Sequence, residues 1–385
     1  MWPEFEADEI AAVGRVLESG RVNYWTGEEG RAFEAECAAR FGARYGVALA
    51  NGTLALDLAL RVSGITAGDE VIVTPRSFVA SVSTVALCGA RPVFADVDRE
   101  SQNVTERTIE PLITSRTRAI LPVHLGGWPC DMPAIMDLAE ANGLVVIEDC
   151  AQAHGAEFRG APVGSFGHLA AFSFCQDKIM TTAGEGGLLI TDDAGLFDKA
   201  ASFKDHGKNL SKLGSPSANG AFRYIHDQLG SNYRMTEVQA AVGRVQLGKL
   251  AHWLATRRNN AAYWNEALAD LAGIRLTIPP DHIAHAYYKY YAFIEPEAFK
   301  SGWDRDRLLQ ELRNAGVICF SGSCPEIYLE KAFANVPGAQ SADRLPAARE
   351  LGNTSLMFLS DPTISTDQIA GWANTVRRLV SAAVR

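Results

Sequence analysis

Three polar groups, far apart in the chain, each follow an apolar segment with the composition of a β-strand. They are Asn51-Gly52-Thr53, Asp149 and Lys178. Open α/β sheets bind ligands beyond the carboxyl ends of their strands, so these groups are the first candidates for a binding site. Each alone has a simpler explanation, because Asn51 suits a helix cap and Lys178 suits a solvated charge on a glycine-rich loop.

Together the three groups match three functional groups of one cofactor, pyridoxal phosphate. Its phosphate needs amides and hydroxyls at a helix N-terminus, such as those of Gly52 and Thr53. Its ring nitrogen needs a carboxylate to stay protonated, and Asp149, at the end of a mostly apolar strand, needs a cationic partner. Its aldehyde needs a lysine for a Schiff base, and Lys178 is available. The sequence therefore predicts a pyridoxal-phosphate enzyme.

The segments that position these groups alternate between short strands and helices. The expected strands are Val47–Ala50, Glu70–Val73, Pro92–Ala95, Ala119–Val123, Val145–Glu148, Ala170–Phe174 and Leu188–Thr191. The expected helices between them are Thr53–Val62, Val79–Cys88, Ile109–Ile113 and Met132–Asn142. This alternation is typical of a sheet with helical crossovers, and we expect an α/β fold whose seven-stranded sheet is mixed but mostly parallel.

Two domains are expected from the order of elements. Residues 1–250 form the large cofactor-binding domain, which begins with a helical segment over about residues 1–42. Residues 251–385 form a smaller α+β domain, with a strand at Tyr287–Ile294 and helices near Asp304–Ala315 and Thr366–Ala383.

The connection between these domains should be helical. Thr236 and Gln239 form a capping-box pattern, which marks a helix start, and we expect this helix to run toward Trp253.

The composition excludes several classes of protein. The 385 residues carry a net charge of −9, which argues against nonspecific nucleic-acid binding. No apolar run approaches the roughly 20 residues of a membrane span, and the acidic start MWPEFEADEI is unlike a targeting peptide, so we expect a cytoplasmic protein without a membrane partner. The seven cysteines lack CxxC pairing, which predicts neither a disulfide framework nor a metal site.

Seven strings in the chain resemble one known family. They are ANGTLALDLAL, GDEVIVTPRSFVAS, GARPVFADVD, PVHLGG, VVIEDCAQAHGA, SFCQDKIMTTAGEGG and GSNYRMTEVQAAVGRVQL. Together they are similar to the DegT/DnrJ/EryC1/StrS aminotransferases, whose members mostly aminate keto sugars on nucleotides. The resemblance covers the chain from about Leu17 and implies a fold-type I pyridoxal-phosphate enzyme, a homodimer with active sites at the subunit interface.

The resemblance also implies roles for individual residues. Lys178 corresponds to the lysine that binds the cofactor and later moves a proton between the cofactor and the substrate carbon. Asp149 corresponds to the carboxylate that pairs with the ring nitrogen. The remaining matches are cofactor contacts: Gln152 beside the phenolic oxygen, Gly52, Thr53 and Ser173 at the phosphate, and Phe78 stacked on the ring.

Asn232, in GSNYR, resembles an asparagine that reaches the phosphate across the dimer interface. Four further residues are candidate substrate contacts from their place in polar or aromatic loops: Tyr24, Trp25, Lys208 and His285. Tyr24 and Trp25 equally suit a packing anchor between two helices. A diphosphate also needs cations, and the candidates are Lys204, His206, Lys208, Lys212 and Arg223.

One departure from the family lies in the loop of Lys178. Ala183 stands before the glycine turn, where many relatives have one residue fewer or a glycine, and a longer version of the loop also occurs in the family; the resemblance therefore leaves the register of this loop open and identifies the lysine.

The leading hypothesis is transfer of an amino group, with L-glutamate as donor, to a keto group of a nucleotide-linked hexose. The two half-reactions would share one site and pass through pyridoxamine phosphate. Two alternatives stay open: a transaminase of a ketocyclitol or aminoshikimate-type substrate, and a catalytically silent regulator that only binds the cofactor.

Overall fold

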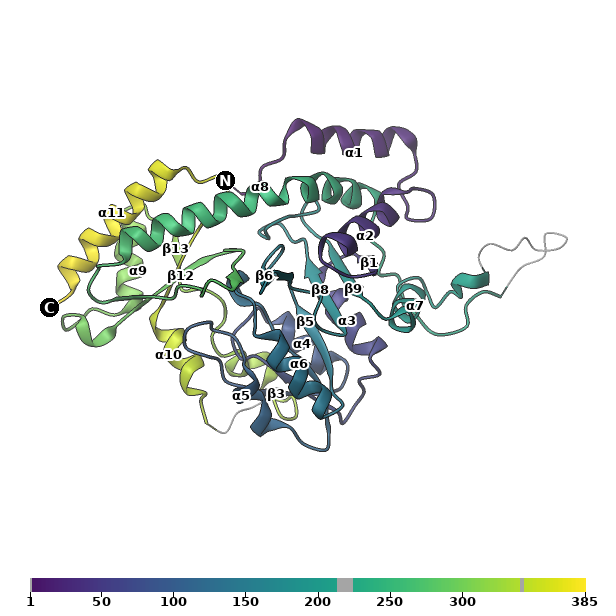
Figure 1. The fold of residues 1–385 in the computed structure, drawn as a ribbon, viewed down its shortest axis with the longest axis horizontal. Helices are drawn as coiled ribbons and strands as arrows, with labels where there is room; N and C mark the ends of the chain where they lie inside the picture. Colours follow the sequence, from purple (N-terminus) through teal and green to yellow (C-terminus); the bar gives the residue numbers. More distant parts are fainter. Residues whose placement is uncertain (1, 213–223, 340–342) are drawn as a thin grey trace.

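The computed structural model describes residues 2–212, 224–339 and 343–385. Its centre is a seven-stranded sheet with the strand order β1-β9-β8-β5-β4-β2-β3 (Figure 1). The strands are β1 (Tyr45–Leu49), β2 (Glu70–Val73), β3 (Arg91–Phe94), β4 (Thr117–Leu121), β5 (Val145–Asp149), β8 (Leu169–Ser173) and β9 (Gly187–Thr191). All seven expected strands overlap these elements, so the prediction of an α/β fold is confirmed.

The direction of the strands brings the candidate residues together. Strand β9 is antiparallel to both of its neighbours, β1 and β8, whereas the pairs from β8 through to β3 are all parallel. Six strands therefore end at one edge of the sheet, which is where such sheets bind ligands.

Both faces of the sheet are covered, because successive side chains in a strand point to opposite sides. Leu169 and Ala171 of β8 lie in one core with helices α3, α4 and α7. Ala170 and Phe172 lie in another core with α2 and α8. The helices are α1 (Ala7–Ser19), α2 (Glu29–Arg40), α3 (Gly52–Val62), α4 (Ala80–Leu87), α5 (Glu106–Ile109), α6 (Met132–Ala141), α7 (Ala194–Phe203), α8 (Glu237–Leu268), α9 (Arg305–Asn314), α10 (Pro346–Thr354) and α11 (Thr366–Ala383).

A second, four-stranded antiparallel sheet lies in the C-terminal part, with the order β10-β12-β14-β13. Its strands are β10 (Ile274–Leu276), β12 (Tyr290–Ile294), β14 (Ser355–Phe358) and β13 (Cys319–Phe320). A small third sheet joins β11 (Ile283–Ala284), β6 (Glu157–Phe158) and β7 (Ala161–Pro162). The expected strand at Tyr287–Ile294 is too long, because Tyr287 has a left-handed backbone (φ +46°) and pairing starts at Tyr290.

Helix α8 is longer than the sequence suggested, and its predicted end near Trp253 is wrong. It runs from Glu237 to Leu268 and spans the molecule from the side of α1 and α2 to α11 (Figure 1). The extension buries Ala261, Trp264 and Leu268 in the core of the small sheet, at helical spacing. The predicted domain division at residue 250 therefore falls inside a continuous helix, and the division itself stays a prediction.

None of the described helices has the length and apolar composition that a membrane span requires.

Candidate active site

Lys178 lies on the hairpin that joins β8 to β9. The loop is closed by its own backbone, since Phe174 N–H donates to the carbonyl of Gly186 at 2.8 Å. Ala183, where the sequence departs from the family, has a left-handed backbone with φ +62°. That conformation costs a residue with a Cβ about 1–2 kcal/mol. The departure at Ala183 therefore coincides with a strained turn, five residues beyond Lys178.

Two aromatic side chains hold the Lys178 segment. The indole N–H of Trp2 donates to the carbonyl of Lys178 at 2.7 Å. On the other side, Lys178 Nζ lies 4.9 Å from the centre of the Tyr288 ring, and the Tyr288 hydroxyl donates to Asp177. Trp2 and Tyr288 lie far from Lys178 in the sequence, on either side of it, so the tertiary fold orients the lysine.

The turn after β1 combines a helix cap with a close approach of two elements. Asn51 caps α3, because its side-chain oxygen accepts from Leu54 N–H at 3.0 Å. Gly52 and Thr53 form the first turn of that helix. A Cβ on Gly52 would lie 2.6 Å from Ser173 Cβ, so only glycine fits between α3 and the end of β8. Asn51 is therefore a helix cap, which was its simpler explanation in the sequence. The amides of the first turn of α3 and the hydroxyl of Thr53 remain for a ligand.

Asp149 ends β5 and is 4% exposed. Ser81 Oγ–H donates to its Oδ2 at 2.7 Å, and Ala151 N–H donates to its Oδ1 at 3.1 Å. No ion pair joins Asp149 to any cation among the described residues. Burial raises the pKa of Asp149 above its ordinary value, and the bonds from Ser81 and Ala151 offset only part of that. A positive group at this carboxylate would offset part of the cost of burying it.

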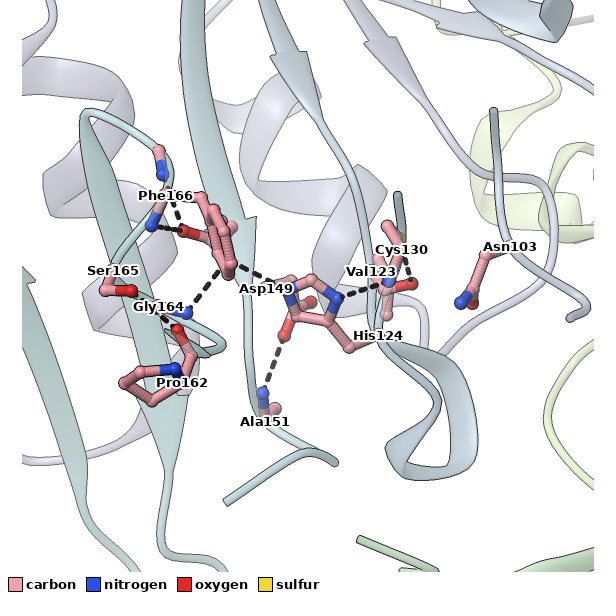
Figure 2. A network of polar contacts seen from close by, with 12 residues as sticks. Asn103, Val123, His124, Cys130, Asp149, Ala151, Pro162, Gly164, Ser165 and Phe166 are labelled. Carbon is pink, nitrogen blue, oxygen red and sulfur yellow. Dashed lines mark hydrogen bonds and ion pairs between the residues drawn. The ribbon is translucent and has the colours of Figure 1, made fainter. Parts of the chain in front are cut away.

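A buried network next to Asp149 fixes the end of β5 (Figure 2). Cys130 N–H donates to His124 Nδ1 at 3.0 Å, so the other ring nitrogen carries the proton and donates to Glu148 Oε2 at 3.0 Å. Glu148 also accepts backbone N–H groups from Gly164, Phe166 and Gly167, at 2.9, 2.9 and 2.6 Å. Both ring nitrogens of His124 are thus engaged by protein partners, and the network supports the end of the strand.

One cavity of about 990 Å³ collects seven of the residues predicted from the sequence. They are Gly52, Thr53, Phe78, Asp149, Gln152, Ser173 and Lys178. Phe78 is 63% exposed although it is a large aromatic, which leaves its ring free for a planar ligand. Gln152 is buried, and its Oε1 accepts from Gly126 N–H at 2.8 Å.

Comparisons with known proteins agree with this geometry. The model of the DegT/DnrJ/EryC1/StrS aminotransferase family matches residues 3–377. The chain belongs to this family. It is 37% identical to a UDP-N-acetyl-3-dehydro-alpha-D-glucosamine 3-aminotransferase of Acidithiobacillus ferrooxidans, over 96% of this chain and 94% of the relative. It is 34% identical to a dTDP-3-amino-3,4,6-trideoxy-alpha-D-glucose transaminase of Streptomyces venezuelae, over 98% and 93% of the two chains.

A solved aminotransferase from Psychrobacter cryohalolentis has the same fold, with a TM-score of 0.97 and 47% identity over 100% of this chain and 99% of that one. The predictions of the family and of an aminotransferase are therefore confirmed.

This family of aminotransferases uses pyridoxal phosphate, as predicted, and the cavity fits that cofactor. The N-terminus of α3 offers amides and the Thr53 hydroxyl to a phosphate, Lys178 offers an amine, and the buried Asp149 lacks the cation that a protonated ring nitrogen provides. When bound, the cofactor supplies an electron-poor ring that withdraws electrons from the reacting carbon.

Five predicted site residues lie outside this cavity: Tyr24, Trp25, Lys208, Asn232 and His285. Tyr24 donates its hydroxyl to Glu34 at 2.8 Å, and Lys208 Nζ lies 4.7 Å from the centre of the Trp25 ring. Asn232 is exposed.

His285 is buried against Trp128, and burial lowers the pKa of His285 to about 3. Of the cations expected near a diphosphate, Lys204 is buried and pairs with Glu34, and Arg223 lies outside the described residues.

Sequence reasoning gave no role to two residues of the cavity wall, Ser81 and Lys289. Ser81 stands three residues after Phe78, at the start of helix α4, and its N–H donates to the Phe78 carbonyl at 3.2 Å, so a small hydroxyl at this spacing was a usable signal. Lys289 is the single charge in the aromatic run YYKYY, which was a second signal.

Proposed function

We propose that this aminotransferase transfers the amino group of L-glutamate to the ketone of a nucleotide-linked hexose. The observation that carries the proposal is the joining of Lys178, Asp149 and the N-terminus of α3 in one cavity of about 990 Å³. That volume lies at the upper end of the usual range for ligand pockets, and suits a cofactor together with a sugar substrate. The names of the two relatives support a sugar carried on a nucleotide.

The chain's own residues divide the work. Lys178 is the catalytic base and acid: its Nζ takes a proton from the carbon of the amino donor and returns one to the carbon that was the ketone. Asp149 holds the proton on the ring nitrogen. Ser81 and Ala151 keep its carboxylate in one orientation, and water is excluded from it because the side chain is buried. Gly52 and Thr53 would hold the phosphate, with Ser173 beside them, and Phe78 would offer its ring to the cofactor.

The proposal includes a homodimer in the cytoplasm. Asn232 is exposed and lies outside the cavity of its own chain, which suits a residue that completes the site of a partner subunit. The cluster of Tyr24, Trp25 and Lys208 is proposed to act in the same way toward the substrate. His285 is buried and does not line the cavity, so its role stays a prediction without a contact to support it.

Subunit mixing tests the shared site. Lys178→Ala and Asn232→Ala subunits are mixed, and a hybrid dimer recovers one intact site if Asn232 acts across the interface. Activity that never exceeds the sum of the two parent variants would remove Asn232 from the partner's site.

A turnover assay tests the function itself. Cofactor-loaded enzyme is given L-glutamate and 3-keto or 4-keto nucleotide sugars, and 2-oxoglutarate and the aminated sugar are measured. A ketocyclitol in place of the sugar tests the alternative substrate class. A protein that holds the cofactor but releases no 2-oxoglutarate with any acceptor would be a silent regulator, and the proposal would be wrong.

A further inference from the structure

Lys289 brings a cation into the cavity from the second sheet. It directly precedes β12, and its backbone N–H donates to the Gly126 carbonyl at 3.4 Å. Its Nζ lies 4.7 Å from the centre of the Tyr288 ring, and Lys178 Nζ lies 4.9 Å from the same centre. Lys289 therefore brings its ammonium into the same part of the cavity as the reacting lysine, since both Nζ atoms lie close to one ring.

Carboxylates outnumber ammonium groups on the described part of the cavity wall. The charged residues there are Asp149, Asp177, Glu185, Glu330, Lys178 and Lys289. Asp177 already accepts the hydroxyl of Tyr288. Within the described ranges, no hydrogen bond or ion pair reaches Lys289 Nζ, whose polar contact is the face of the Tyr288 ring.

The ammonium of Lys289 is also partly desolvated. Burial lowers the pKa of Lys289 below its ordinary value, and nearby Asp177 offsets part of that change. A cation in this state gains from an anionic ligand, because the ligand replaces the water it has lost.

We infer that Lys289 binds an oxyanion of the substrate, a carboxylate or phosphate oxygen of the molecule that reacts at Lys178. The inference rests on the proposed function, since both proposed substrates are anions that occupy the cavity in turn. Lys178 is engaged with the cofactor, so Lys289 is the ammonium that remains on the described wall. L-Glutamate would present a carboxylate to it, and a nucleotide sugar would present its diphosphate.

Binding measurements test this role without turnover. Glutarate, an unreactive dicarboxylate, and the nucleotides UDP and dTDP are titrated calorimetrically into the cofactor-loaded enzyme. The variants are Lys289→Gln, which removes the charge, and Lys289→Arg, which keeps it. Lys199→Gln, on the exposed side of α7, is the control for loss of one lysine charge.

Removing a bond between an ammonium and an oxyanion should raise Kd about tenfold to a hundredfold. A rise in Lys289→Gln for glutarate alone assigns the donor's carboxylate, a rise for a nucleotide alone assigns the diphosphate, and a rise for both assigns one shared position. In each case Lys289→Arg retains most of the affinity and Lys199→Gln is unchanged.

Three outcomes overturn the inference: Lys289→Gln binds all probes like the wild type, Lys289→Arg loses as much affinity as Lys289→Gln, or the wild type binds none of the probes. The proposed function fails separately. If probe binding depends on Lys289 but the enzyme forms no 2-oxoglutarate, the anion site at Lys289 stands and the proposed amino transfer is wrong.

Discussion

Asp149→Asn should have opposite effects on catalysis and on the stability of the cofactor-free protein. The carboxylate is 4% exposed, accepts from Ser81 and Ala151, and has no cationic partner in the described chain. Asparagine has nearly the same shape. Its side-chain oxygen still accepts from Ala151, and the Ser81 hydroxyl can accept as well as donate. The substitution therefore removes a charge with little change in packing.

The loss in catalysis follows from breaking a buried ionic contact. Removing one partner of such a pair costs about 3–5 kcal/mol, which corresponds to about two to nearly four orders of magnitude in kcat/KM. Asparagine cannot hold the proton on the ring nitrogen, so this loss should appear already with L-glutamate alone. The assay is the rate of the first half-reaction, followed by the absorbance of the bound cofactor.

The gain in stability follows from the pKa of Asp149. Because this pKa is raised in the folded protein, the native state binds a proton that the unfolded chain has already released. The free energy of unfolding therefore falls as the pH rises from the ordinary carboxyl pKa through the folded-state value, and the whole penalty is present above it. Asp149→Asn lacks this penalty, so without cofactor it should unfold at a higher temperature than the wild type at pH 8. The difference should vanish at low pH.

Glu185→Gln is the matched control, because it removes a carboxylate of the same cavity that is exposed to solvent. Its unfolding should follow the pH dependence of the wild type. Thermal unfolding of the cofactor-free proteins between pH 4 and pH 8 makes the comparison. Equal pH dependence in Asp149→Asn and wild type, or turnover within about threefold of wild type, would refute the account of Asp149.

Three other substitutions test the support of the site. Lys178→Ala should fold, bind the cofactor reversibly and lose amino transfer, and borohydride should fix the cofactor on the wild-type peptide containing Lys178 but not on the variant; retained turnover would exclude the lysine from the chemistry. Ser81→Ala removes a 2.7 Å bond to a carboxylate and should lower kcat/KM about tenfold to a hundredfold, while Ser77→Ala leaves that bond in place and should have a smaller effect, so equal effects would contradict the role of Ser81. Trp2→Phe removes the bond to the Lys178 carbonyl and should lower the free energy of unfolding by about 0.5–1.5 kcal/mol, with faster hydrogen exchange in the Lys178 hairpin; exchange that speeds up only near Trp2 would show that the bond does not hold the loop.

The sequence was informative where chemistry demands a particular residue type at a strand end. A lysine, a carboxylate and a glycine-hydroxyl turn each followed a strand, and parallel strands bring their ends to one edge whatever the loops between them do. The length of α8 could not be predicted from the sequence in the same way. Its second half looks polar in sequence, and only the core of the small sheet explains why Ala261, Trp264 and Leu268 are buried.

The residues that hold the site were hidden for a different reason. Ser81 is 68 positions from Asp149, Tyr288 is 111 from Asp177, and Trp2 is 176 from Lys178. Each of these three residues donates one hydrogen bond. Several residue types could donate the same bond, so no local sequence pattern identifies the donor. The cofactor's chemistry restricts the type of each residue that contacts it. The residues that hydrogen-bond to those contacts are restricted only by their position in the tertiary fold. The position of Lys289 is also set by the tertiary fold. Its ammonium is nevertheless the one charge in the aromatic run YYKYY, directly before β12. A charge placed there costs desolvation, and the anionic ligand that we infer for Lys289 would offset this cost.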